Sequence, residues 1–102
     1  MGWTIYYTTT LVEQLSPDEE KTINTIIKKW NKKLEDGCEY LFLEKKDNGK
    51  TLEGFSKVQH SIEPEEDFKR IVSALKEIEK TIPVVKFKIT DDYGFINEIE
   101  LG

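Results

Sequence analysis

The spacing of apolar residues along this 102-residue chain changes period several times, and each change falls at a turn or cap signal. Residues 3–10 are aromatic or β-branched throughout, which is typical of a strand. Farther along, apolar residues recur every three or four positions, as they do on one face of a helix. This stripe consists of Ile23, Ile26, Ile27, Trp30 and Leu34. The pattern predicts a strand followed by a helix.

Local signals indicate where that first helix begins and ends. Ser16, Pro17 and Glu19 have the spacing of a capping box with proline at the first helical position. Four lysines toward the other end suit the negative end of the helix dipole, and Gly37 supplies a stop. We therefore expect a helix over about residues 17–36.

A hairpin is predicted next. Residues 39–44 form a short apolar run, Asn48-Gly49 is a strong hairpin signal because both residues tolerate positive φ, and residues 51–60 form the returning strand. The alternation is imperfect around Gly54, which indicates either a bulge or a close backbone contact at that position.

The second half of the chain repeats the alternation of helix and strand. A helix is predicted over residues 64–81, between Pro64 and Pro83. Its apolar stripe consists of Phe68, Ile71, Val72, Leu75 and Ile78. Residues 84–90 alternate as a strand, with Val85, Phe87 and Ile89 on one face. A turn over residues 91–94 and a last short strand over residues 95–101 complete the chain.

The resulting order, β-α-β-β-α-β-β, predicts one domain over residues 1–102 of the α+β class. It is the order of the ferredoxin-like sandwich with an extra C-terminal strand. Right-handed crossovers would place both helices on one face of an antiparallel sheet. The other face of the sheet is then left open to solvent or to a partner.

Several side chains are predicted to point out of that open face. They are Tyr6 on the first strand, Phe55 and Lys57 on the third, and Lys86 and Lys88 on the fourth. The second strand is apolar on both faces, so one of its alternating pairs joins them, either Tyr40 with Phe42 or Leu41 with Leu43. Contiguous exposed apolar groups usually mark an interface.

Charge indicates a second candidate surface. The chain carries a net charge of −5, and residues 91–100 hold four acids and no base. The turn of this acidic C-terminal hairpin contains Asp91, Asp92 and Tyr93, which we take as further candidate binding residues. An acidic chain repels nucleic acid and acidic membranes on average.

Residues 53–60 resemble the third-strand motif of RNA-recognition domains, which share the β-α-β-β-α-β order and stack bases on aromatic side chains of the central strands. The resemblance keeps three positions of the pattern, Gly54, Phe55 and Val58. It departs from the pattern where Glu53 replaces a base and where Lys57 and His60 replace aromatics. It implies single-stranded nucleic-acid binding through Tyr6 and Phe55 as an alternative function.

Catalytic chemistry has one candidate pair. Cys38 and His60 face each other across the hairpin if a single bulge intervenes, and facing Cys and His side chains are the minimum for an activated thiolate. No third group that would orient the imidazole and no oxyanion-hole motif accompany them. The acids of residues 91–100 lack the spacing of a calcium loop. We therefore expect no enzyme activity, no metal and no cofactor.

The chain has a single cysteine, no basic and apolar leader at its start, and no apolar run of the roughly 20 residues that span a membrane. These features predict a cytoplasmic protein that does not bind membranes. Small inhibitors, including toxin-immunity proteins, have this size and charge. The sequence thus favours an acidic protein-interaction module, either inhibitory or regulatory, whose partner is another protein or a second copy of the chain. A purely homodimeric domain is a further alternative.

Overall fold

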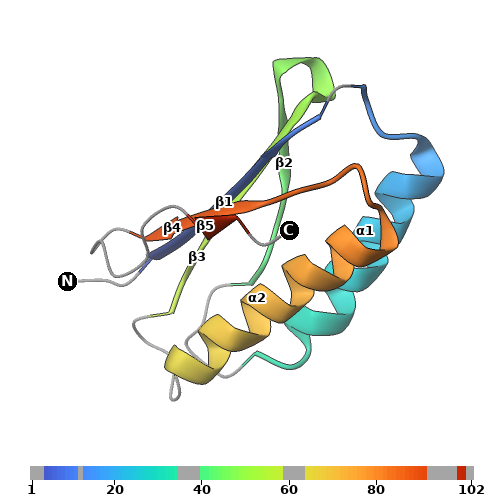
Figure 1. The fold of residues 1–102 in the computed structure, drawn as a ribbon. Coiled ribbons are helices and arrows are strands. Elements are labelled where there is room, and N and C mark those ends of the chain that lie inside the picture. The colour runs from blue at the N-terminus through green and yellow to red at the C-terminus, as the bar shows by residue number, and fades with distance from the viewer. Residues whose placement is uncertain (1–3, 12, 35–39, 59–63, 92–98, 101–102) are drawn as a thin grey trace.

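The computed structural model describes residues 4–11, 13–34, 40–58, 64–91 and 99–100. Its elements are β1 (Thr4–Thr10), α1 (Pro17–Asn31), β2 (Glu44–Lys46), β3 (Thr51–Lys57), α2 (Pro64–Thr81), β4 (Lys88–Asp91) and β5 (Ile99–Glu100). The strands form one sheet in the order β2-β3-β1-β4-β5, and every pairing is antiparallel. Figure 1 shows α1 and α2 side by side on one face of that sheet. The α+β class, with two helices and an antiparallel sheet, is confirmed.

Both helices begin where the sequence predicts. The Ser16 hydroxyl accepts from the Glu19 N–H at 3.2 Å, and the Ser16 N–H donates to the Glu19 carboxylate at 2.9 Å, which completes the capping box. However, α1 ends at Asn31 and does not run to residue 36. The Lys33 N–H donates to the Trp30 carbonyl at 2.9 Å, which tightens the last turn. Lysines spaced four apart, such as Lys28 and Lys32, also disfavour a longer helix.

The core lies between the sheet and the helices. Its fully buried side chains come from β1, from β3 and the residue after it, from α2, and from β4 and the stretch that leads into it. They include Ile5, Tyr7, Val58, Ile71, Leu75, Ile78, Val85, Phe87 and Ile89. The predicted inward faces of the first strand, the second helix and residues 84–90 are therefore confirmed for the described residues.

The fourth strand is shorter than predicted, because β4 begins only at Lys88. Side chains accept hydrogen bonds from two backbone donors in the stretch before it. The Phe87 N–H donates to the Glu79 carboxylate at 2.6 Å, and the Lys86 N–H donates to the Thr9 hydroxyl at 3.2 Å. Residues 84–87 keep the predicted alternation of burial without joining the ladder.

The predicted hairpin turn is confirmed. Asn48 has φ 58° and ψ 34°, Gly49 has φ 84°, and the Lys50 N–H donates to the Asp47 carbonyl at 3.2 Å. These values match the type I′ turn that Asn-Gly favours. The flanking strands pair in the predicted register, with Glu44 opposite Glu53.

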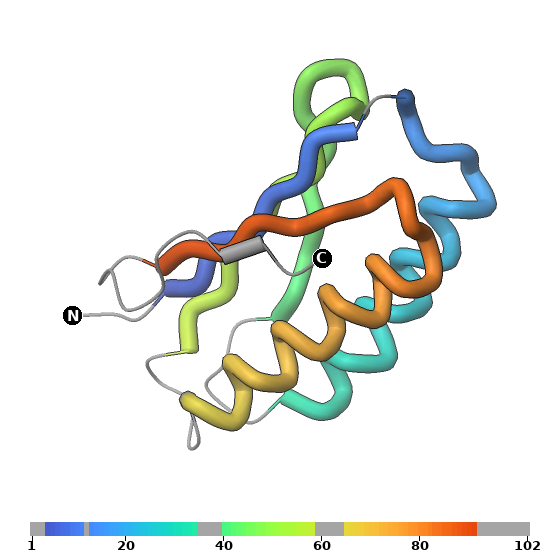
Figure 2. The backbone as a smooth tube through the Cα atoms, in the orientation of Figure 1, coloured from blue at the N-terminus to red at the C-terminus, as the bar shows by residue number. Residues whose placement is uncertain are grey.

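The second strand lies later in the chain than the sequence predicts. Residues 39–44 were expected to form it, but β2 spans Glu44–Lys46 and residues 40–43 are not strand. In Figure 2 this segment is the green tube that leads into β2. The Leu41 backbone instead pairs with the side-chain amide of Asn31, at 2.8 Å through its N–H and 3.1 Å through its carbonyl.

A buried chain of hydroxyl groups holds the same segment against β3. The Phe42 N–H donates to the Tyr7 hydroxyl at 3.2 Å, the Tyr7 and Ser56 hydroxyls lie 3.0 Å apart, and the Ser56 hydroxyl donates to the Tyr40 carbonyl at 3.3 Å. The Ser56 proton is committed to Tyr40, so Tyr7 must donate to Ser56. Each hydroxyl then donates once and accepts once.

Gly54 makes this arrangement possible. A Cβ atom at this position would lie 2.0 Å from the Phe42 carbonyl oxygen and 2.7 Å from Cε2 of Tyr7. The β1–β3 ladder continues through the Tyr7–Gly54 pair with no extra residue. Of the two predicted explanations for Gly54, the close backbone contact is confirmed and no bulge occurs in this ladder. The third strand ends at Lys57, and residues 59–60 lie outside the described part of the chain, as does Trp3.

Candidate functional site

Three aromatic side chains gather on the sheet face that the helices leave open. Tyr6 pairs with Phe55 across β1 and β3, and their ring centroids lie 6.2 Å apart. Phe42 meets Phe55 edge to face at 5.2 Å. Their exposed fractions are 43% for Tyr6, 38% for Phe42 and 41% for Phe55. We call these three residues the aromatic triad.

Charged residues border the aromatic triad along the strand direction. On one side, Thr8 pairs with Lys88 on β4 and with Glu53 on β3, and Glu53 pairs in turn with Glu44 on β2. On the other side, Lys57 is exposed on β3 opposite Thr4. A shallow hollow of about 510 Å³ lies over the face, lined in part by Tyr6, Phe42, Phe55, Glu44, Glu53 and Lys88.

Lys46 lies close to both acids of this border. Its ammonium nitrogen is 3.6 Å from the Glu44 carboxylate and 4.0 Å from the Glu53 carboxylate. All three side chains are about half exposed, so these contacts contribute little to stability. The acidic pair Glu44 and Glu53 beside the aromatic triad is therefore partly neutralised by Lys46.

The structure brings together part of the predicted candidate set. Tyr6, Phe55, Lys57 and Lys88 lie on the open face. Lys86 is exposed but precedes β4, and Asp91 is the last residue of β4 and is partly buried. Asp92 and Tyr93, and with them the turn of the acidic hairpin, lie outside the described residues.

The sequence left open which apolar pair of residues 39–44 joins the open face, and the pair is split. Phe42 lies in the aromatic triad, whereas Tyr40, at 65% exposure, lines a separate hollow beside α1. That hollow is also lined by Asn24, Ile27, Lys28, Asn31 and Lys32. The expectation that Tyr40 and Phe42 share a face is therefore wrong, because residues 40–43 do not form a strand and no ladder holds their side chains to the two faces of the sheet.

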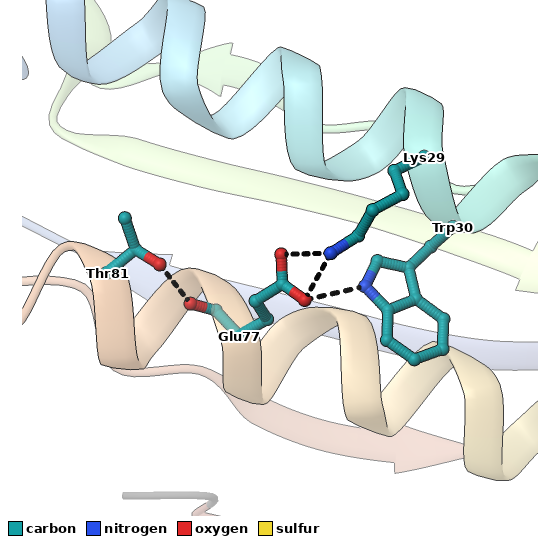
Figure 3. A network of polar contacts seen from close by, with 4 residues as sticks. All are labelled: Lys29, Trp30, Glu77 and Thr81. Carbon is teal, nitrogen blue, oxygen red and sulfur yellow. Dashed lines mark hydrogen bonds and ion pairs between the residues drawn. The ribbon is translucent and has the colours of Figure 1, made fainter.

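A polar network joins the two helices on the other side of the molecule (Figure 3). The Glu77 carboxylate accepts from the Lys29 ammonium at 2.6 and 2.7 Å and from the Trp30 indole N–H at 3.2 Å. The hydrogen bond from Lys29 is the largest cause that lowers the pKa of Glu77 below its ordinary value. Lys33 lies 4.6 Å from the centre of the Trp30 ring. These contacts fasten α1 to α2 and leave no open site.

The catalytic candidates Cys38 and His60 lie outside the described residues. Within the described ranges, no group of three or more His, Cys, Asp or Glu side chains could hold a metal ion. Nor does any helix in those ranges have the length and apolar character needed to cross a bilayer.

Comparisons with protein families, with curated proteins and with solved structures find no match for this chain.

Proposed function

We propose that this chain is a small acidic protein-interaction module, inhibitory or regulatory in role, that binds through the open face of its sheet. The aromatic triad carries the proposal: Tyr6 and Phe42 each lie against Phe55, and all three large side chains stay about 40% exposed on a sheet face. Large exposed apolar clusters on small domains usually mark interfaces, and aromatic residues are enriched at the centres of such interfaces.

The surroundings of the triad also favour a protein partner. Interfaces commonly have an apolar centre and a polar rim, and here the rim comprises Glu44, Glu53, Lys57 and Lys88. Opposite charges in the rim favour one orientation of a partner over others. We further propose that the fold is ferredoxin-like, since a split β-α-β unit gives the order β2-β3-β1-β4. The lone cysteine supports a cytoplasmic location, and we propose no enzymatic activity.

Site-specific photo-crosslinking in cells tests the proposal directly. A benzophenone amino acid replaces Phe55 in one variant and Ser73, which is exposed on α2, in a matched control. We expect discrete protein adducts at position 55 that weaken when Tyr6 is changed to alanine, and none at position 73. Equal labelling at both positions, or no protein adduct at position 55, would contradict the proposal.

Single-stranded nucleic-acid binding is the second candidate, and one observation favours it. Tyr6 and Phe55 are neighbours on β1 and β3, where RNA-recognition domains carry their stacking aromatics. The acids Glu44 and Glu53 beside them repel phosphate, so we expect weak binding that disappears with added salt. A gel-shift series at two salt concentrations checks this. Tight, salt-resistant binding that is lost in Tyr6→Ala and Phe55→Ala would place this candidate first.

A further inference from the structure

The open face carries opposite charges at equal distances from the aromatic triad. On β3, Glu53 lies two residues before Phe55 and Lys57 lies two residues after it, and all three are exposed. Alternate residues of a strand point to the same side, so the order along the face is acid, aromatic, base. On β1 the matching positions are Thr8, Tyr6 and Thr4, which carry no charge.

This order is its own complement under a twofold rotation. Consider a second copy laid face to face on the first and related to it by a twofold axis that lies in the interface. The axis runs perpendicular to the strands and passes over the row formed by the aromatic triad. Such an axis places aromatic residues over aromatic residues. It also places Glu53 of each copy opposite Lys57 of the other, because the rotation exchanges the two sides of the row. Isologous interfaces of this kind are the commonest in homo-oligomers.

We propose that a second copy of this chain is the partner of the open face, in a dimer with the twofold axis across the strands. This inference rests on the proposed function and names its partner. A twofold axis parallel to the strands, between β1 and β3, also brings aromatic side chains together, but it sets Phe42 over Thr90 of the second copy, so the two triads do not stack. It exchanges β2 with β4 and would place Glu44 opposite Lys88 at the outer strands of the face. The axis across the strands sets each residue of the triad over its own counterpart, and it places its ion pairs on β3, near the centre of the face.

The size of the face sets the expected affinity. β1 has 7 residues, so the face is roughly 24 Å long, and four strands spaced about 4.8 Å apart make it roughly 19 Å wide. Because β2 has 3 residues and β4 has 4, the product of about 450 Å² per copy, or about 900 Å² in total, is an upper bound, and it lies below the area of stable complexes. Interfaces of this size are typical of weak, transient association, so we expect the dimer to form only at high protein concentration.

Charge reversal with sedimentation velocity tests the dimer. Wild-type protein should show a reversible monomer–dimer equilibrium between about 10 μM and 1 mM. Glu53→Lys or Lys57→Glu alone sets like charges opposite each other twice per dimer and should raise the dissociation constant about tenfold. The double variant E53K/K57E restores opposite charges and should return it to near the wild-type value. Within one chain the two residues lie about 14 Å apart along β3, so rescue cannot come from an ion pair between these two residues of the same chain.

Salt and a second charge swap make the test specific. Added salt should weaken the wild-type dimer and strengthen the dimer of each single variant, because it screens attraction in one and repulsion in the other. The matched swap E44K/K88E exchanges charges that the axis across the strands does not bring together, so it should give no pairwise rescue.

Each of the following outcomes overturns the dimer with its axis across the strands. A protein that stays monomeric at about 1 mM has no such interface. A dimer that E53K and K57E leave unchanged, or that the double variant does not restore, uses other contacts. Rescue by E44K/K88E would mean that the axis runs parallel to the strands. Photo-crosslinks at position 55 separate these failures from that of the proposed function, because adducts to a different protein would keep the interaction module while excluding the second copy.

Discussion

Replacing Gly54 with alanine is the sharpest single test of how the sheet is built. The new Cβ atom would lie 2.0 Å from the Phe42 carbonyl oxygen and 2.7 Å from the Tyr7 ring, so the backbone of residues 40–43 must move. Overpacking of this kind costs about 1–3 kcal/mol. The displacement also breaks the hydrogen bonds from Phe42 to Tyr7 and from Ser56 to Tyr40, at about 1 kcal/mol each.

The free energy of unfolding should therefore fall by about 3–5 kcal/mol, a large part of the roughly 5–15 kcal/mol typical of such a domain. Thermal unfolding should shift downward by at least about 12 °C, and urea titration measures the free energy itself. Gly49→Ala is the matched control. Its Cβ would approach no closer than 3.4 Å to Gln14, so its cost comes only from the positive φ and should be about 1 kcal/mol. A Gly54→Ala variant within about 0.5 kcal/mol of wild type would refute the close contact.

Three further outcomes are expected. Glu77→Gln should lower the free energy of unfolding at pH 7 by up to about 1 kcal/mol. Lys29 holds the pKa of Glu77 below its ordinary value of 4.5, so the difference in stability between the two proteins is fully present above pH 4.5 and disappears as the pH falls through the lowered pKa. Urea titrations between pH 7 and pH 2 measure this difference, which would stay constant with pH if the ion pair were absent. Ser16→Ala should cost about 1 kcal/mol by removing the acceptor for the Glu19 N–H, and a neutral result in thermal unfolding would show that the cap is dispensable. Phe55→Ala should change stability by less than about 1 kcal/mol while abolishing crosslinks from a photo-reactive group placed at Tyr6, whereas unchanged crosslinks would move the interface elsewhere.

Signals that act over a few residues predicted the structure well. The capping box at Ser16, the Asn48-Gly49 turn and the apolar stripe of α2 each concern neighbouring groups, and each is confirmed. The alternation of apolar and polar residues in the sequence also predicts that Tyr6 and Phe55 lie on the open face, where the structure shows them side by side. Local pattern was sufficient wherever the deciding interactions were local.

The two misplaced strands have one cause: side chains distant in sequence satisfy backbone groups that a strand would otherwise pair. Nothing in the run Tyr40–Leu43 indicates that Asn31 will bond to the Leu41 backbone, or that Tyr7 will reach the Phe42 N–H. The same holds before β4, where Glu79 accepts from Phe87. As a result, the sequence could not assign Phe42 to the aromatic triad and Tyr40 to the side of α1. Gly54 was the one sequence signal for this packing: the interrupted alternation around it indicated a close backbone contact, but not that the contact would be with Phe42.

The shortness of β2 has a consequence for how the protein behaves at high concentration. Sheets grow into aggregates when an outer strand presents a long row of unpaired backbone groups to another chain. Here the outer strand beside β3 has only three residues, Glu44–Lys46, all charged and exposed. Short, charged outer strands resist addition of a further strand. Association at this side by strand addition is therefore disfavoured, and the dimer that we propose, through the open face, would end once two copies have met.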